Sequence, residues 1–468
     1  MLCTIAAAMV LPAVVDVADR HDDWKIFFGA AVLTFFVGGL MVLVAYDDEP
    51  VQLGIREGFL LTTVAWLALT AAAAVPFKLL GLSYADSFFE AMSGITTTGA
   101  TVLVGLDKLP RGVLFWRALL QGLGGLGIIV MAILMLPFLR VGGMQLFQTE
   151  NSDKSEKIMP RAFELTLSIA GVYVALMFAC SVVYVVLGMT FFDAICHALT
   201  TVSTAGFSTH DESFGFFRSP SLEWACVFFM ILGALPFVVF IKAIHGDRMA
   251  IWRDSQVQGF LSFVVVVSFT LAAWLILTRE IAAGEAVRVA IFSVVSIVTT
   301  TGFAVEDYTA WGTFSIGLFF LLKFVGGCSG STTGGIKIYR LQVAGMLARS
   351  HFLHLISPNR VVTLMYNKRR LPDDVPFSVV AFLAIYLATV GIFTVLLASL
   401  DLDLVTSLTA SAQAVGNVGP GLGHLVGPTG NYSTLPNGAK WILSFAMLLG
   451  RLELFTVLVL FRIEFWRS

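Results

Sequence analysis

Long apolar stretches recur along the chain and are separated by short polar segments. A stretch of roughly 20 apolar residues is what a helix needs to cross a hydrocarbon core of about 30 Å. The first two apolar segments, 2–15 and 26–46, predict an accessory helical hairpin whose first helix is short for a complete span. The pattern therefore predicts an all-α polytopic membrane protein that begins with this hairpin.

Beyond the hairpin, one order of elements occurs four times: a long apolar segment, a half-length segment, a polar turn and a second long segment. The pairs of long segments are 55–80 with 113–139, 163–187 with 222–244, 257–278 with 313–325, and 377–400 with 439–465. The half-length segments, each too short to cross a bilayer, are 84–95, 191–203, 285–298 and 404–414. We therefore predict an accessory transmembrane hairpin at 1–50 and four pore repeats at 51–145, 146–254, 255–371 and 372–468.

The four polar turns are rich in threonine and glycine and are unusual in so apolar a sequence. Their glycines, Gly99, Gly206, Gly302 and Gly419, follow one another at similar intervals, as internal repeats do. Backbone that is not helical is tolerated at membrane depth only where it is buried in protein or lines an aqueous cavity. Four such turns, each at the end of a half-length helix, predict one shared site in a central pore.

The chemistry of the turns favours a monovalent cation. The half-length helices end at the turns, so their partially negative C-terminal ends face the shared site. Glycine permits positive φ and leaves the lumen open, and a ring of backbone carbonyls can replace the hydration shell of K⁺. The predicted K⁺ ligands are the glycines and the two residues before each: Thr97, Thr98, Gly99, Thr204, Ala205, Gly206, Thr300, Thr301, Gly302, Asn417, Val418 and Gly419.

The composition supports a membrane protein and excludes other classes. Hydrophobic residues make up 57% of the chain and charged residues 13%, with a mean hydropathy of +0.88. A soluble protein would carry about a quarter of charged residues. The net charge of −2 gives no basic footprint for nucleic acid. The five cysteines stand singly without metal-ligand spacing, so we interpret them as small core residues.

The charges of the loops predict the orientation. Basic residues occur in loops away from the turns: Arg140, Lys154, Lys157, Arg161, Lys242, Arg248, Arg253, Arg349, Arg360, Lys368, Arg369, Arg370, Arg462 and Arg467. Acidic residues lie beside the turns instead: Asp107, Asp211, Glu212, Glu306, Asp307, Asp401 and Asp403. By the positive-inside rule, the turns face the exterior and the basic loops face the cytoplasm.

Two further features interrupt the apolar pattern. The segment 326–335 breaks the third repeat with small residues: Gly326, Gly327, Ser329, Gly330, Ser331, Thr332, Thr333, Gly334 and Gly335. It is either a site of helix packing or a break that faces protein or water. Arg451 lies near the middle of an apolar segment, where arginine costs about 2.5–3.5 kcal/mol, so it faces either a pore or an ion-pair partner. Glu453, two positions on, projects to another helix face.

The four turns, the repeat length and the segments 326–337 and 450–454 together resemble the Trk/Ktr/HKT superfamily of potassium transporters. The leading hairpin and the sequence Thr301-Gly302-Phe303-Ala304 are most similar to the membrane subunits of bacterial Trk systems. The resemblance implies four pseudo-repeats of helix, pore helix, filter loop and helix around one central pore. It also implies that 326–335 lies beneath the filter as a gating loop with Arg451 beside it.

The resemblance carries further expectations about selectivity and partners. Glycine at all four filter positions goes with K⁺ preference in this family. The fourth turn departs most from the others, with Asn417 and Pro420, so we expect the fourfold symmetry to be weakest there. The family implies a homodimer in the bacterial inner membrane, in contact with lipid and joined to a cytosolic nucleotide-binding regulatory subunit like TrkA. The basic segment 349–370 is either its docking surface or ordinary positive-inside charge.

The pattern thus predicts a K⁺-selective uptake protein rather than an enzyme. The alternative is a secondary transporter coupled to Na⁺ or H⁺, for which Glu90, Asp193 and Glu453 are the candidate intramembrane carboxylates. The GxGxxG sequence at 122–127 lies inside an apolar segment, so we interpret it as helix packing and expect no nucleotide in this chain. We expect His197, His210 and His424 to be hydrogen-bonded or exposed rather than metal ligands.

Overall fold

The computed structural model describes residues 1–46, 54–135, 158–367 and 369–467. The predicted boundaries after residues 50 and 145, and the basic residues Arg140, Lys154, Lys157 and Lys368, lie outside these ranges. The division of the chain into five parts therefore stays a prediction. Within the described ranges the protein is helical apart from a two-residue antiparallel pair, β1 (Met365–Tyr366) with β2 (Arg369–Arg370).

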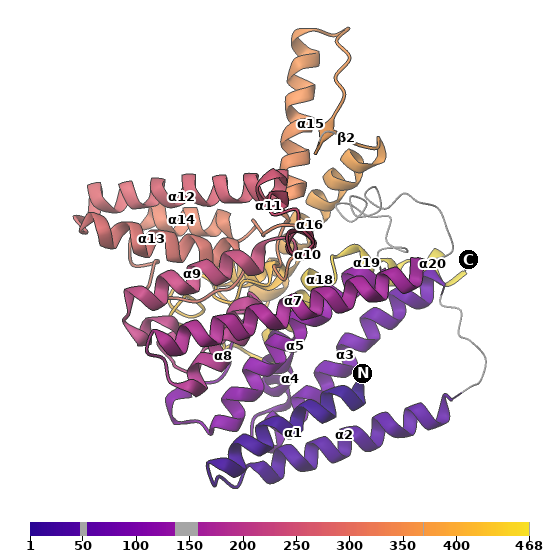
Figure 1. Ribbon diagram of the computed structural model, residues 1–468, viewed down its shortest axis with the longest axis vertical. Helices are drawn as coiled ribbons and strands as arrows, with labels where there is room; N and C mark the ends of the chain where they lie inside the picture. The colour runs from indigo at the N-terminus through magenta and orange to yellow at the C-terminus, as the bar shows by residue number, and fades with distance from the viewer. Residues whose placement is uncertain (47–53, 136–157, 368, 468) are drawn as a thin grey trace.

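The predicted order of elements is present in the structure (Figure 1). The hairpin is α1 (Leu2–Ala18) and α2 (Trp24–Val44). The elements of the first two predicted repeats are α3 (Ile55–Leu79), α4 (Tyr84–Ile95), η1 (Leu106–Lys108), α5 (Arg111–Met135), α7 (Ile158–Val186), α8 (Phe191–Val202), η3 (Ser213–Phe217), α9 (Pro220–Ala234), α10 (Phe237–Ile244) and α11 (Ala250–Arg253). Those of the last two are α12 (Ser255–Arg279), α13 (Ala283–Val298), α14 (Thr313–Leu322), α15 (Ile338–Ile356), α16 (Asp374–Ala398), α17 (Leu404–Gly416), α18 (Asn437–Arg451), α19 (Phe455–Leu458), η4 (Val459–Phe461) and α20 (Ile463–Arg467).

Three of the four half-length helices begin at a side-chain cap. Ser83 accepts a hydrogen bond from the Asp86 amide at the start of α4, and Thr190 accepts one from the Asp193 amide at the start of α8. At the start of α17, Asp403 accepts from the amide of Thr406. Such caps satisfy amides that the first turn of a helix leaves unpaired. The starts of these short helices are therefore encoded locally.

Two segments that the sequence predicts as single spans are bent. The segment 222–244 divides into α9 and α10 at an angle of 93°, and 439–465 divides after α18 at an angle of 108°. Pro236 at the first break has no amide to continue the helix. At the second break, Glu453 and Leu454 have positive φ angles of 57° and 29°. The prediction of two continuous helices is therefore wrong.

The spanning helices confirm a multi-pass membrane protein. Six described helices are long and apolar enough to cross a bilayer, or up to eight if each bent pair counts as one span. The predicted span 313–325 is wrong as a separate crossing, because α14 has 10 residues and rises only about 15 Å. Its path continues through 326–335 into α15, which stands out from the helical body in Figure 1.

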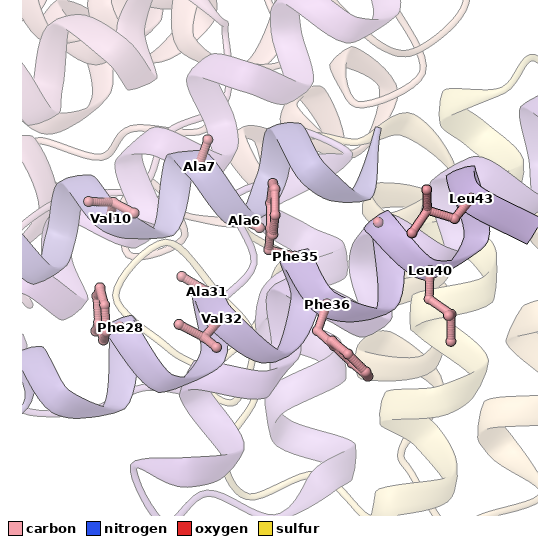
Figure 2. Close-up of a pocket in the computed structure, with 11 residues that line it drawn as sticks. Ala6, Ala7, Val10, Phe28, Ala31, Val32, Phe35, Phe36, Leu40 and Leu43 are labelled. Atoms are coloured by element: carbon pink, nitrogen blue, oxygen red, sulfur yellow. The ribbon is translucent and has the colours of Figure 1, made fainter. Parts of the chain in front are cut away.

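The accessory hairpin is anchored to the first repeat by a buried carboxylate. Asp16 on α1 accepts a hydrogen bond of 2.7 Å from the Gly112 amide in the first turn of α5. On their other side, α1 and α2 enclose a hollow of about 510 Å³ that is lined by apolar side chains, including Val10, Phe28 and Leu40 (Figure 2). The hollow contains no filter or loop residue, and it is separate from the site described below.

The GxGxxG sequence lies within α5 and serves helix packing, as predicted. A Cβ atom at Gly124 would overlap the carbonyl of Ile95 at the end of α4. A Cβ atom at Gly125 would lie 2.9 Å from the Cβ of Ser203, which follows α8. Small residues on α5 therefore let it approach two half-length helices closely.

Candidate functional site

The four turns share one backbone conformation. The first residue of each is left-handed, with φ of 52° at Thr97, 51° at Thr204, 58° at Thr300 and 53° at Asn417. Two residues later the glycines are left-handed as well, with φ of 86°, 78°, 84° and 95° in chain order. Among the glycines the fourth has the largest φ, and the expectation that the symmetry is weakest at this turn stays a prediction.

Each turn closes its half-length helix with a Schellman pair of hydrogen bonds. In the first turn the Thr98 amide donates to the Ser93 carbonyl at 2.9 Å, and the Thr97 amide donates to the Gly94 carbonyl at 3.0 Å. Equivalent pairs begin at Ala205 and Thr204, at Thr301 and Thr300, and at Val418 and Asn417. These amides of the turns are thus used within the protein, whereas the carbonyls of the turns accept no bond from a backbone amide of the described residues.

The glycines bring the four turns together in a closed ring. A Cβ atom at Gly99 would overlap the carbonyl oxygen of Ala205, one at Gly206 that of Thr301, and one at Gly302 that of Val418. The ring closes at Gly419, where a Cβ atom would lie 2.8 Å from the carbonyl oxygen of Thr98. Each glycine therefore packs against the residue that precedes the glycine of the next turn. A side chain at any of the four positions would displace a ring carbonyl.

Polar side chains outside the turns donate hydrogen bonds to carbonyls in or next to the ring. The sequence analysis did not identify these side chains. Gln121 on α5 donates to the Ala205 carbonyl at 2.9 Å, Tyr432 donates to the Gly419 carbonyl at 3.1 Å, and Lys323 donates to the Pro420 carbonyl. Gln121 and Lys323 are each a polar residue within a predicted apolar span. Their position in those spans was the available signal.

A buried ion pair holds the backbone segments that follow the first two turns. Arg117 Nε lies 2.7 Å from Glu90 Oε1, and both side chains are at most 1% exposed. Glu90 also accepts from the Val102 amide, and Arg117 donates to the Ser208 carbonyl, both at 2.9 Å. Thr101 bonds both members of the pair. Glu90 is therefore fully engaged in holding the backbone that follows the first two turns.

The histidines are hydrogen-bonded or exposed, as expected. His197 is buried, with Nδ1 2.8 Å from the Asp193 carbonyl and Nε2 3.0 Å from Ser208 Oγ. His424 is exposed. His210, in the loop after the second turn, bonds Asp107 through Nδ1 and has Nε2 3.6 Å from Asp193. Burial alone would lower the pKa of His210, but the two carboxylates outweigh it and raise that pKa.

The Gly-rich segment 326–335 lies against three of the four turns. Its ends meet where the Gly326 amide donates to the Ile336 carbonyl at 2.8 Å. The Gly334 amide donates to Thr300 Oγ1 at 2.8 Å, and the hydroxyls of Thr332 and Thr204 lie 3.0 Å apart. A Cβ atom at Gly334 would also lie 3.0 Å from Asn417 Cβ. Of the alternatives, packing of a continuous helix is thus excluded, because the segment is a folded loop.

Arg451 closes α18 beside this loop. Its guanidinium is buried and donates from Nη1 to the Thr332 carbonyl at 2.9 Å, while Nε and Nη2 have no hydrogen-bond partner within the described ranges. Glu453 pairs instead with Arg340 on α15, at 2.6 Å. In the part of the chain that the structure describes, Arg451 forms no ion pair, and its guanidinium bonds the loop instead.

Comparisons with known proteins agree with this architecture. The model of the TrkH family, described as a cation transport protein, matches residues 24–467. The chain is 42% identical over 467 residues to the Trk system potassium uptake protein TrkI of Halomonas elongata, covering 99% of this chain and 94% of that protein. It is 35% identical over 479 residues to the TrkH protein of Escherichia coli, with 100% and 98% covered. The crystal structure of the potassium transporter TrkH from Vibrio parahaemolyticus superposes with a TM-score of 0.91 at 32% identity, covering 99% of this chain and 97% of the other.

The buried ion pair behind the turns generates a prediction about stability. The variant Glu90→Ala leaves Arg117 buried without its counter-charge, which should lower the free energy of unfolding by about 3–5 kcal/mol. Asp19→Ala is the matched control, because it removes the exposed carboxylate of the Arg111–Asp19 pair. Thermal unfolding of the purified proteins in detergent measures both. If the midpoint temperature of unfolding is as high for Glu90→Ala as for Asp19→Ala, the buried pair does not stabilise the fold as stated.

Proposed function

Because the chain belongs to the TrkH family of cation transport proteins, we propose that it takes up K⁺ across the bacterial inner membrane through the ring of four turns. The observation that carries the proposal is the ring itself. Four left-handed turns at the ends of four half-length helices place the carbonyls of Thr98, Ala205, Thr301 and Val418 against one another's glycines. Such a ring is suited to a dehydrated monovalent cation.

The electrostatics of the ring support K⁺ as the ion. The turns contain neutral oxygen donors, and the C-terminal ends of α4, α8, α13 and α17 add partial negative charge toward them. A divalent ion would need carboxylates, and none lies within the four turns. We assign the twelve residues of the turns as the filter. Each elementary charge that enters the cell gains about 2.3 kcal/mol per 100 mV of inside-negative potential, so uptake through this filter needs no second ion.

The described carboxylates give little support to the alternative of a coupled carrier. Glu90 is bound to Arg117, and Glu453 is bound to Arg340. Asp193 accepts from Thr209 Oγ1 at 2.7 Å and from the Thr190 hydroxyl at the same distance. Each of the three candidate proton or sodium sites thus has a structural partner, which favours conduction of K⁺ alone.

The loop 326–335 and Arg451 have the geometry expected of a gate. The loop contacts the first residues of the second, third and fourth turns, so it occupies the side of the ring on which the half-length helices end. Arg451 holds Thr332 of this loop and contributes a buried positive charge there. A cation that leaves the filter on this side must displace the loop and pass the guanidinium. We therefore assign both to the closed state of the pore.

The partner assignments follow the family and one surface of the structure. Helix α15 begins one residue after Lys337, projects from the body and carries the exposed side chains Phe352 and Ile356 near Arg349 (Figure 1). An exposed apolar surface of this kind marks a site of interaction with a protein or a membrane, and its projection away from the spanning helices favours a cytosolic protein. We propose that a nucleotide-binding subunit like TrkA docks there, on a homodimer whose filter turns face the exterior. Membrane lipid covers the spanning helices.

The gate assignment predicts the effect of removing the intramembrane charge. Arg451→Ala should increase K⁺ flux through the reconstituted protein, because it removes both the positive barrier and the bond that holds Thr332. The preference for K⁺ over Na⁺ should remain, since the ring is intact. Arg253→Ala, which removes an exposed arginine of the predicted cytoplasmic side, is the control. Unchanged or lower flux in Arg451→Ala proteoliposomes would refute the gate assignment.

The filter assignment predicts a loss of discrimination when a ring glycine gains a side chain. Gly99→Ser should weaken selection against Na⁺, because its Cβ atom displaces the Ala205 carbonyl and a left-handed serine is strained. Gly105→Ser is the matched control: this glycine is also left-handed, with φ of 73°, but a Cβ atom there meets nothing within 4 Å. Bi-ionic reversal potentials give the K⁺/Na⁺ permeability ratio. Equal ratios for the two variants would contradict the role of the first turn.

A further inference from the structure

The first and third turns contain an internal hydroxyl pair. Thr96 Oγ1 lies 2.8 Å from Thr98 Oγ1, and Thr299 Oγ1 lies 2.8 Å from Thr301 Oγ1. The earlier threonine of each pair also bonds a carbonyl of its half-length helix, that of Met92 in the first repeat. In these two turns the residue before the glycine is thus tied to its own helix by its side chain.

The second turn lacks this pair. Ser203 and Ala205 occupy the corresponding positions, and the Ser203 hydroxyl bonds back to the Leu199 carbonyl at 2.6 Å. Ala205 has no side-chain donor or acceptor. Beyond its backbone bonds to α8, the second turn is therefore held by a side chain of another element.

Gln121 provides that group from a different repeat. Its Nε2 donates to the Ala205 carbonyl at 2.9 Å, and its Oε1 accepts from the Phe207 amide at 2.9 Å. The side chain is 0% exposed. One bond needs a donor and the other an acceptor, so the orientation of the amide is fixed by its partners. The two bonds span Gly206, whose left-handed conformation turns the chain between them.

Arg117 lies one helical turn before Gln121 on the same face of α5. It donates to the Ser208 carbonyl at 2.9 Å, and its guanidinium lies 4.2 Å from the centre of the Phe207 ring. Helix α5 of the first repeat therefore holds the second turn on both sides of Gly206. The hydrogen bond from Gln121 to Ala205 differs from the contacts with Phe207 and Ser208, because the Ala205 carbonyl is part of the ring.

We propose, on the basis of the function proposed above, that Gln121 is a positioning residue that sets the discrimination of the second turn between K⁺ and Na⁺. The Ala205 carbonyl packs against Gly99 on one side and accepts from Gln121 on another. A carbonyl held in this way resists the inward movement that coordination of the smaller Na⁺ requires.

The test uses the full-length protein in liposomes and measures K⁺/Na⁺ permeability ratios from bi-ionic reversal potentials. Q121L removes both hydrogen bonds, while Q121E keeps the size of the side chain and the acceptor for Phe207 and, as a carboxylate, has no donor for Ala205. Q342L is the control, because Gln342 also makes two side-chain hydrogen bonds, to Ser255 and Tyr366, outside the ring. Loss of one hydrogen bond of about 1 kcal/mol corresponds to about a fivefold change in the ratio.

We expect Q121L and Q121E to lower the ratio about fivefold while K⁺ flux persists, and Q342L to keep the wild-type ratio. A purely structural Gln121 would reduce K⁺ and Na⁺ flux together and leave the ratio unchanged, and that result would overturn the proposal. If Q121L cannot be recovered as folded protein, the K⁺/Na⁺ permeability ratio of Q121E tests the proposal by itself. A wild-type protein without K⁺ preference would refute the proposed function instead, which keeps the two failures distinct.

Discussion

Backbone that leaves a helix within a membrane must satisfy its hydrogen bonds inside the protein, and the rest of this structure depends on that constraint. The four turns meet it with the same device, in which two amides bond back to the half-length helix. Once the amides are used in this way, the carbonyls project from the helix ends without being buried in a further bond to the backbone. The hydrogen bonds of the amides stabilise the turn, and the carbonyls are thereby left to bind an ion.

The same constraint links the loop 326–335 to the bent helices. At the break between α9 and α10, the Ala234 carbonyl accepts from the Cys328 amide and the Phe237 amide donates to the Gly330 carbonyl, both at 3.0 Å. The backbone groups freed by Pro236 are therefore satisfied by the loop, and those of the loop by the broken helix. Arg451, at the second break, adds its bond to Thr332. Each irregular segment is stable because another irregular segment lies beside it, which ties the position of the loop to the helices around it.

The sequence alone predicted the parts of this structure that depend on local pattern. The apolar runs located the half-length helix 84–95 to the residue, since Ser83 caps its start and the polar turn ends it. The glycines of the four turns were predicted because their spacing repeats. The breaks at Pro236 and Leu454 were missed because apolar residues continue on both sides of each, although Pro236 and the charged residues Arg451 and Glu453 were visible signals. The partners of Gln121 and Glu453 lie 84 and 113 residues away, and no local pattern specifies such contacts.

If the ring is an ion site, the carbonyls of Thr98, Ala205, Thr301 and Val418 enclose one bound cation. Anomalous diffraction from crystals grown in Rb⁺ or Tl⁺, which substitute for K⁺, can locate that cation. We expect a strong anomalous peak enclosed by these four oxygens. A peak bound only at the acidic loops outside the ring, or a ring without any peak in protein that conducts the same ion, would contradict it.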